Sequence, residues 1–194
     1  MTPRQTDRLR QKIADIKRIL AAEKKKFGWY DDSRGLRYLP ARYYVQLGDF
    51  KGGLAYTRWF AKNFPDDAGF ADFLFEWTII LFKSDKTEDA KRKAIETFCA
   101  DIHLIDSFLG RPSSPKEAWE HSAITADEFA LYFTSIRQVD LTGFTEWLAT
   151  FTTTERFLSS SSRYITLHQQ LEGERDLEKR RHLVRQLGQI AHAS

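Results

Sequence analysis

The stretch from residue 70 to residue 82 constrains the fold more than any other part of the sequence. Its apolar side chains recur with helical spacing and lie almost all the way around the helix that they predict. Such a helix is stable in water only when neighbouring elements cover it on several sides. The β-branched pair Ile79 and Ile80 also suits a strand, but thirteen residues of helical spacing outweigh so short a run. We therefore expect a buried helix here, surrounded by other helices.

The rest of the chain predicts helices as well. Only 10 glycines and 5 prolines occur in 194 residues, and the longer apolar patterns follow a 3.6-residue period. Thr2, Pro3 and Gln5 form a capping box that begins a helix, which we expect to run to about Lys26 with a single apolar stripe. Further helices are expected at 39–47, 50–63, 87–100, 115–121, 126–136, 141–151, 153–171 and 175–191, and residues 102–109 are expected to form a short helix or a turn. The predicted fold class is all-α.

Two glycine-containing segments carry more specific expectations. Residues 28–35 predict a packed connector, in which Trp29 and Tyr30 lie against a neighbouring helix. Gly52 and Gly53 fall inside a predicted helix, where each costs roughly 1 kcal/mol relative to alanine. The close approach of another backbone would account for that cost.

Composition excludes several classes of protein. A content of 42% hydrophobic residues is too high for a disordered chain, and the single cysteine, Cys99, forms neither an intramolecular disulfide nor a cysteine metal cage. The longest apolar run, residues 77–82, is far shorter than the roughly 18 to 20 residues that span a bilayer. Basic residues interrupt the first 20 positions, so no export signal is visible. We expect one soluble, cytoplasmic, all-α domain over residues 1–194, without a membrane partner.

Charge is distributed unevenly along the chain. The net charge of +3 arises because residues 1–27 hold nine Lys or Arg against three Asp or Glu, whereas the remainder is net acidic. One interpretation is an ordinary solvated helix. The other is a site for nucleic acid or an acidic partner, favoured by Lys24, Lys25 and Lys26 before Phe27 and Trp29.

Motifs for catalysis or cofactor binding are absent from the sequence. The five histidines show no metal-binding spacing, and no glycine-rich phosphate loop follows a predicted strand. Ser159 to Ser162 lack the flanking glycines of a nucleophile elbow, and Cys99 lies on an apolar helix face. Glu76, on the most apolar helix, suits either a catalytic carboxylate or, as we favour, a structural salt bridge. We therefore predict no enzyme activity, no catalytic residue, no metal and no cofactor.

Two consecutive segments share a repeated pattern. Residues 34–67 resemble a tetratricopeptide repeat, and residues 71–103 resemble a second copy. The first copy carries the pattern through Ala41, Tyr44, the turn at Leu47, Gly48, Asp49 and Phe50, then Gly53 and Pro65. The second copy carries it through Trp77, Thr78, Leu81, Asp85, Lys86, Ala90 and Ala94.

The resemblance implies an architecture and a function. It implies an antiparallel stack of helical hairpins, with 1–27 as a capping helix, 34–103 as two hairpins, and 104–194 as flanking helices that complete the stack. In that family the first helix of each repeat lines a groove for a peptide or a partner helix. The chain would then be a non-catalytic protein-interaction module or scaffold, and a homo-oligomer is compatible with it. Nucleic-acid or acidic-partner binding through the first helix is the alternative, and an enzyme is less favoured.

Family positions also predict the residues of that groove. The polar candidates for partner binding are Tyr38, Arg42, Gln46, Asp72 and Lys83. The apolar residues on the same surface are Val45, Phe75, Ile79 and Phe82. The alternative is that Phe75, Ile79 and Phe82 belong to the core, and that Arg42 and Gln46 are ordinary solvent-facing residues.

Overall fold

A computed structural model describes the chain except for residues 31, 112–131, 135, 137–138 and 192–194. Throughout the described residues the fold is helical and contains no strand, which confirms the all-α prediction. The helices are α1 (Pro3–Phe27), the 3₁₀ helix η1 (Leu36–Tyr38), α2 (Leu39–Leu47), α3 (Phe50–Asn63), α4 (Ala71–Lys83), α5 (Thr87–Ala100), α6 (Leu104–Phe108), α8 (Thr142–Phe151), α9 (Glu155–Gly173) and α10 (Leu177–Ala191). The helix predicted at 115–121 and most of that predicted at 126–136 lie outside the described residues.

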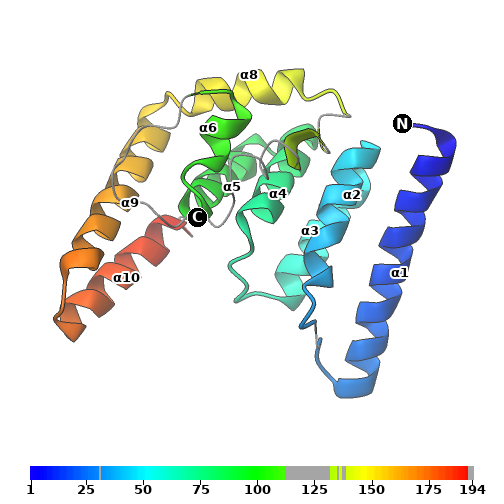
Figure 1. The fold of residues 1–194 in the computed structure, drawn as a ribbon, viewed down its shortest axis with the longest axis horizontal. Helices are drawn as coiled ribbons and strands as arrows, with labels where there is room; N and C mark the ends of the chain where they lie inside the picture. The colour runs from blue at the N-terminus through cyan, green and yellow to red at the C-terminus, as the bar shows by residue number, and fades with distance from the viewer. Residues whose placement is uncertain (31, 112–131, 135, 137–138, 192–194) are drawn as a thin grey trace.

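Helix α1 begins and ends where local chemistry predicts. The Thr2 hydroxyl accepts a hydrogen bond from the Gln5 amide at 3.3 Å, and the Gln5 side chain accepts one from the Thr2 amide at 2.7 Å. Gly28 ends the helix at a φ of 81°, a conformation that favours glycine. Helix α1 packs along α2 at one edge of the molecule (Figure 1).

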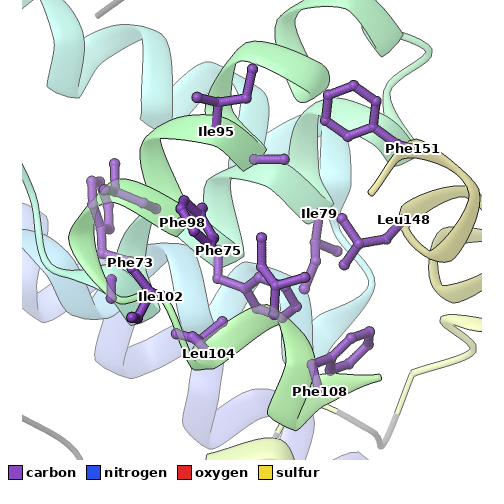
Figure 2. Packing of buried hydrophobic residues seen from close by; sticks show 14 of the residues in the cluster. Phe73, Phe75, Ile79, Ile95, Phe98, Ile102, Leu104, Phe108, Leu148 and Phe151 are labelled. Carbon is purple, nitrogen blue, oxygen red and sulfur yellow. The ribbon is translucent and has the colours of Figure 1, made fainter. Parts of the chain in front are cut away.

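Helix α4 lies at the centre, as its apolar circumference predicts. It contacts α2, α3, α5 and α8, and its residues Phe75, Ile79 and Ile80 are fully buried. Side chains from α4, α5, α6 and α8 converge in one hydrophobic cluster (Figure 2). Because four helices contact α4, most of its apolar surface is buried by the fold, and Trp77 stays half-buried.

Antiparallel hairpins are arranged around this centre in an arch (Figure 1). Helices α2 and α3 form the first hairpin, and their turn passes through Gly48 at a φ of 65°. Helices α4 and α5 form the second, while α9 and α10 form a third that packs against α5. The expectation of a closely approaching backbone at Gly52 and Gly53 was wrong, because the near neighbour of Gly53 is a side chain: an added Cβ would lie 3.0 Å from that of Ile80.

The connector after α1 fulfils only half of its prediction. Tyr30 packs on α3, with its ring centre 5.5 Å from that of Trp59 and 4.9 Å from that of Phe64. The expectation for Trp29 was wrong, since this residue is 66% exposed. Adjacent side chains in a non-helical segment point to different sides, so the turn that buries Tyr30 directs Trp29 outward.

None of the helices in the described part of the structure combines the length and apolar character needed to cross a bilayer.

Candidate functional site

The first candidate surface is the one predicted from the repeat pattern, on α2 and α4. Of its five polar residues, the structure joins Arg42 and Asp72 in an ion pair. Tyr38 lies in η1 and donates a hydrogen bond from its hydroxyl to Asp67 at 2.8 Å. Gln46 on α2 and Lys83 at the end of α4 are both partly exposed.

Arg42 is the centre of a largely buried polar network. Its Nε donates to Oε1 of Glu76 at 2.7 Å, while the other side of the guanidinium pairs with Asp72. The guanidinium carbon also lies 4.9 Å from the ring centre of Tyr132, whose hydroxyl donates to the Asp72 carbonyl at 3.1 Å. The charges of Arg42 and Asp72 are thus used within the protein, and they connect α2, α4 and Tyr132.

Glu76 has the more unusual environment of the two carboxylates. It is 1% exposed. Burial raises the pKa of Glu76 to about 8, although the Arg42 charge acts to lower it. The structural salt bridge that the sequence favoured for Glu76 is confirmed by its contact with Arg42.

The apolar residues of the predicted surface lie beneath later helices. Val45, Phe75 and Ile79 are fully buried, which confirms the core interpretation for Phe75 and Ile79. Phe82 packs between Phe144 and Trp147 of α8, at ring-centre distances of 5.6 and 4.8 Å. Helix α8 therefore covers part of the face on which the groove was predicted.

An open groove occurs elsewhere, along α4: two of its hollows lie between α3 and α5, and the third lies between α5 and residues 68–72, beside Tyr164 of α9 and Ala191 of α10. Three adjoining hollows of about 270, 360 and 570 Å³ follow α4 from Leu81 to Ala71. Ala61 and Trp77 line the first two hollows, Leu74 and Ala68 line the second two, and Glu96 lines all three. Because they share these residues, the hollows form one continuous depression, which we call the α3–α5 groove.

The α3–α5 groove combines an apolar floor with charged walls. Trp77 is half-buried in the floor, and Nζ of Lys93 lies 4.1 Å from its ring centre. Lys93 also pairs with Glu96, and Arg92 pairs with Asp89, all on α5. These contacts hold the α5 wall in place beside Trp77, while the floor residues Leu74 and Leu81 are buried.

The loop that shapes one side of this groove is anchored by a second polar network. Arg37 donates from Nε to Oδ2 of Asp67 at 2.7 Å, and it also pairs with Asp32 at 3.2 Å. Although burial opposes the change, hydrogen bonds from Arg37, the Gly69 amide and Tyr38 lower the pKa of Asp67. Asp67 therefore stays ionised and fixes the residues 64–70 beside the groove.

Sequence reasoning did not find the α3–α5 groove. Its polar residues on α5 read as a normal solvated helix face, and Trp77 reads as core. The contact between Lys93 and Trp77 marks the groove, but these two residues become neighbours only when α4 and α5 pack together. The sequence alone does not show that contact.

Groups that could bind a metal ion or react as nucleophiles are the last feature of the described residues. No group of three or more His, Cys, Asp or Glu among them is placed to hold a metal ion. Burial raises the pKa of Cys99 to about 12, so this side chain, which lines the largest hollow, is a thiol at neutral pH.

Comparisons with known proteins add no assignment. No protein-family model, curated protein or solved structure matches the chain.

Proposed function

We propose that this protein is a non-catalytic interaction module, TPR-like in architecture, that binds a helix of a partner protein in the α3–α5 groove. The open groove is the observation that carries the proposal. The packing of α4 against both helices of the preceding hairpin supports a repeat-like stack. The proposal places the binding surface on α3 and α5, whereas the family resemblance favoured the first helices, α2 and α4.

A helix suits this groove better than an extended peptide. The backbone groups of α3, α4 and α5 are used within those helices, and the groove floor consists of apolar side chains such as Leu74, Trp77 and Leu81. An extended peptide would place unpaired N–H and C=O groups against this floor. A helix satisfies its backbone internally and presents an apolar stripe instead.

The dimensions are compatible with a short helix. Helix α4 has 13 residues and extends for about 20 Å, and the groove follows most of it. A partner helix of about three turns would cover the floor, with its apolar side chains at i, i+3, i+4 and i+7 spacing.

A blocked groove tests the proposal. Ala61 is exposed and lines two of the hollows, so Ala61→Trp should fill the centre of the groove without disturbing the core. We expect helical peptides selected from a displayed library on the natural protein to bind Ala61→Trp at least about tenfold more weakly, since loss of a central contact costs about 1.4 kcal/mol or more. Titration calorimetry measures the change.

The matched control is Ala55→Trp, on an exposed position of α3 that does not line the groove. It should retain the affinity of the natural protein for the same peptides. Peptides that bind Ala61→Trp and the natural protein equally well would contradict the proposal.

A second candidate function uses α1. Arg4, Arg8 and Lys25 are exposed on this helix and form no ion pair with any described residue, and Trp29 is exposed just beyond its end. These features favour nucleic acid or an acidic partner as the ligand.

A cytoplasmic location, suggested by the single cysteine, is likewise a proposal.

A further inference from the structure

The two ends of the α3–α5 groove differ in charge. At one end, where α5 begins, the hollow is lined by the four cations Arg58, Lys86, Arg92 and Lys93 against the two carboxylates Asp89 and Glu96. At the other end, the hollow of about 570 Å³ is lined by Asp72, Glu96 and Asp101 and, among the described residues, by no lysine or arginine. The groove therefore changes from net positive to net negative along its length.

Not all of these charges are available to a ligand. Arg92 and Lys93 are paired with Asp89 and Glu96 on their own helix. Arg58 and Lys86 are exposed and form no ion pair within the described part of the chain. The unneutralised positive charge of the groove is thus concentrated on Arg58 and Lys86, on opposite walls.

The negative end offers an apolar anchor site instead of a counter-charge. Its hollow is bordered by Phe70, which is 63% exposed, and by Leu74 and Cys99. Asp72 is already paired with Arg42, and Asp101 accepts hydrogen bonds from the amides at the start of α6. An acidic residue placed at this end would meet carboxylates without a free cation, whereas an apolar side chain would cover Phe70.

We infer that the occupant of the groove is an amphipathic helix with acidic side chains at one end, held in a single orientation by Arg58 and Lys86. The acidic end lies between these two residues, and the opposite end buries an apolar side chain near Phe70 and Cys99. Charges at an interface rim determine orientation and partner choice more than total affinity, so the inference concerns which helices bind and in which direction. It rests on the proposed function, because it specifies the ligand of the same groove.

Synthetic peptides of 14 residues provide the probe. Each carries a leucine stripe with helical spacing on an alanine background. Two of the peptides carry three Glu, one of them at its amino end and the other at its carboxyl end. Their two counterparts carry three Lys at the same positions. We expect both glutamate peptides to bind about five- to tenfold more tightly than their lysine counterparts at low salt. Charge reversals Arg58→Glu and Lys86→Glu should remove that difference, whereas Lys25→Glu, an equal charge change on α1, should preserve it.

Orientation is measured separately with a photo-crosslinking residue placed at the glutamate end of each peptide. The acidic end should crosslink to α3 and α5 near Arg58 and Lys86 in both peptides, so the two peptides lie in opposite backbone directions. Crosslinks near Phe70 and Cys99, or equal binding of glutamate and lysine peptides, would overturn the inference. If either of these results were obtained and Ala61→Trp still abolished binding of the peptides, the proposed function would stand. Binding that Ala61→Trp does not reduce, or no binding by any probe, would overturn both.

Discussion

At the scale of single residues, the Arg42–Glu76 pair keeps two ionisable side chains largely out of water. Removing a charge from water is costly, and a buried ion pair compensates for that cost only with close geometry and further hydrogen bonds. The 2.7 Å contact and the second pairing with Asp72 meet this requirement. Loss of Glu76 would remove a hydrogen-bond acceptor from the always charged Arg42, and loss of Arg42 would leave the buried carboxyl group of Glu76 without its partner, which makes the pair more important for integrity than for net stability.

The raised pKa of Glu76 predicts a pH-dependent stability. Between its ordinary value of 4.5 and about 8, the folded protein holds a proton on Glu76 that the unfolded chain has released. The free energy of unfolding should therefore fall as pH rises through this window, by at most about 1.4 kcal/mol per pH unit. Glu76→Gln, which does not titrate, should reduce this slope in urea unfolding measured from pH 5 to pH 8.

A surface carboxylate gives the control for this measurement. Glu88 is exposed, and hydrogen bonding from Lys91 lowers its pKa in the folded protein, so from pH 6 to pH 8 it is ionised in both states. Glu88→Gln should retain the slope of the natural protein. A Glu76→Gln variant with that same slope would show that Glu76 stays ionised beside Arg42.

At the scale of secondary structure elements, α1 behaves as a one-sided cap. Its buried residues Ile13, Ile16 and Leu20 form a single stripe, and Ile13 shares a small cluster with Tyr44 and Tyr56. This cluster is separate from the large core of the later helices. The outward face of α1 is polar, as expected for a terminal element of a stack.

Deletion of residues 1–26 should therefore damage the fold. It would expose Tyr44 and Tyr56 and remove three buried side chains, each worth about 1.5 to 3 kcal/mol, against a typical total stability of about 5 to 15 kcal/mol. We expect an aggregating or molten product, detected by size-exclusion chromatography, thermal unfolding and dye binding. Removal of residues 1–8 alone, which retains the stripe, should leave a folded monomer.

A 27–194 protein that remains monomeric with an unchanged melting temperature would show instead that α1 is a detachable arm. That result would favour the second candidate function.

At the scale of the whole molecule, charge and packing are segregated. Residues 1–27 carry the basic excess on a helix at the edge of the arch, while the rest of the chain is net acidic (Figure 1). Within α1, Arg10 and Arg18 are paired with Asp7 and Asp15, which reduces the charge available to a polyanion. A basic patch on one face, or a basic stripe along a helix, is the usual electrostatic footprint of nucleic-acid binding, and these ion pairs interrupt such a stripe on α1.

This distribution predicts weak binding to polyanions. The full chain should elute from heparin at about 50 mM salt, because few phosphate-like contacts would release counterions. Lys25→Glu should change the elution position only slightly. Strong retention with a steep salt dependence, abolished by Lys25→Glu, would favour nucleic acid as the ligand of α1.

Much of the local structure is determined by the sequence alone. The predicted boundaries 39–47, 50–63 and 87–100 coincide with α2, α3 and α5, since caps, glycine turns and apolar periodicity act over a few residues. The burial of α4 and the paired state of Glu76 were predictable for a similar reason. An apolar circumference requires complete cover, and an isolated carboxylate on such a helix requires a cation.

Only the tertiary structure decided which surfaces are covered and which stay open. Tyr132 reaches Asp72 and α8 covers Phe82 across about 60 residues of chain, and nothing in the pattern of α2 or α4 specifies those contacts. The α3–α5 groove exists because both helices pack on α4 while remaining apart from each other. The periodicity of the sequence shows only that a helix face is apolar. Which long-range neighbour covers that face depends on the packing energy of the whole chain, and this placed the groove on α3 and α5.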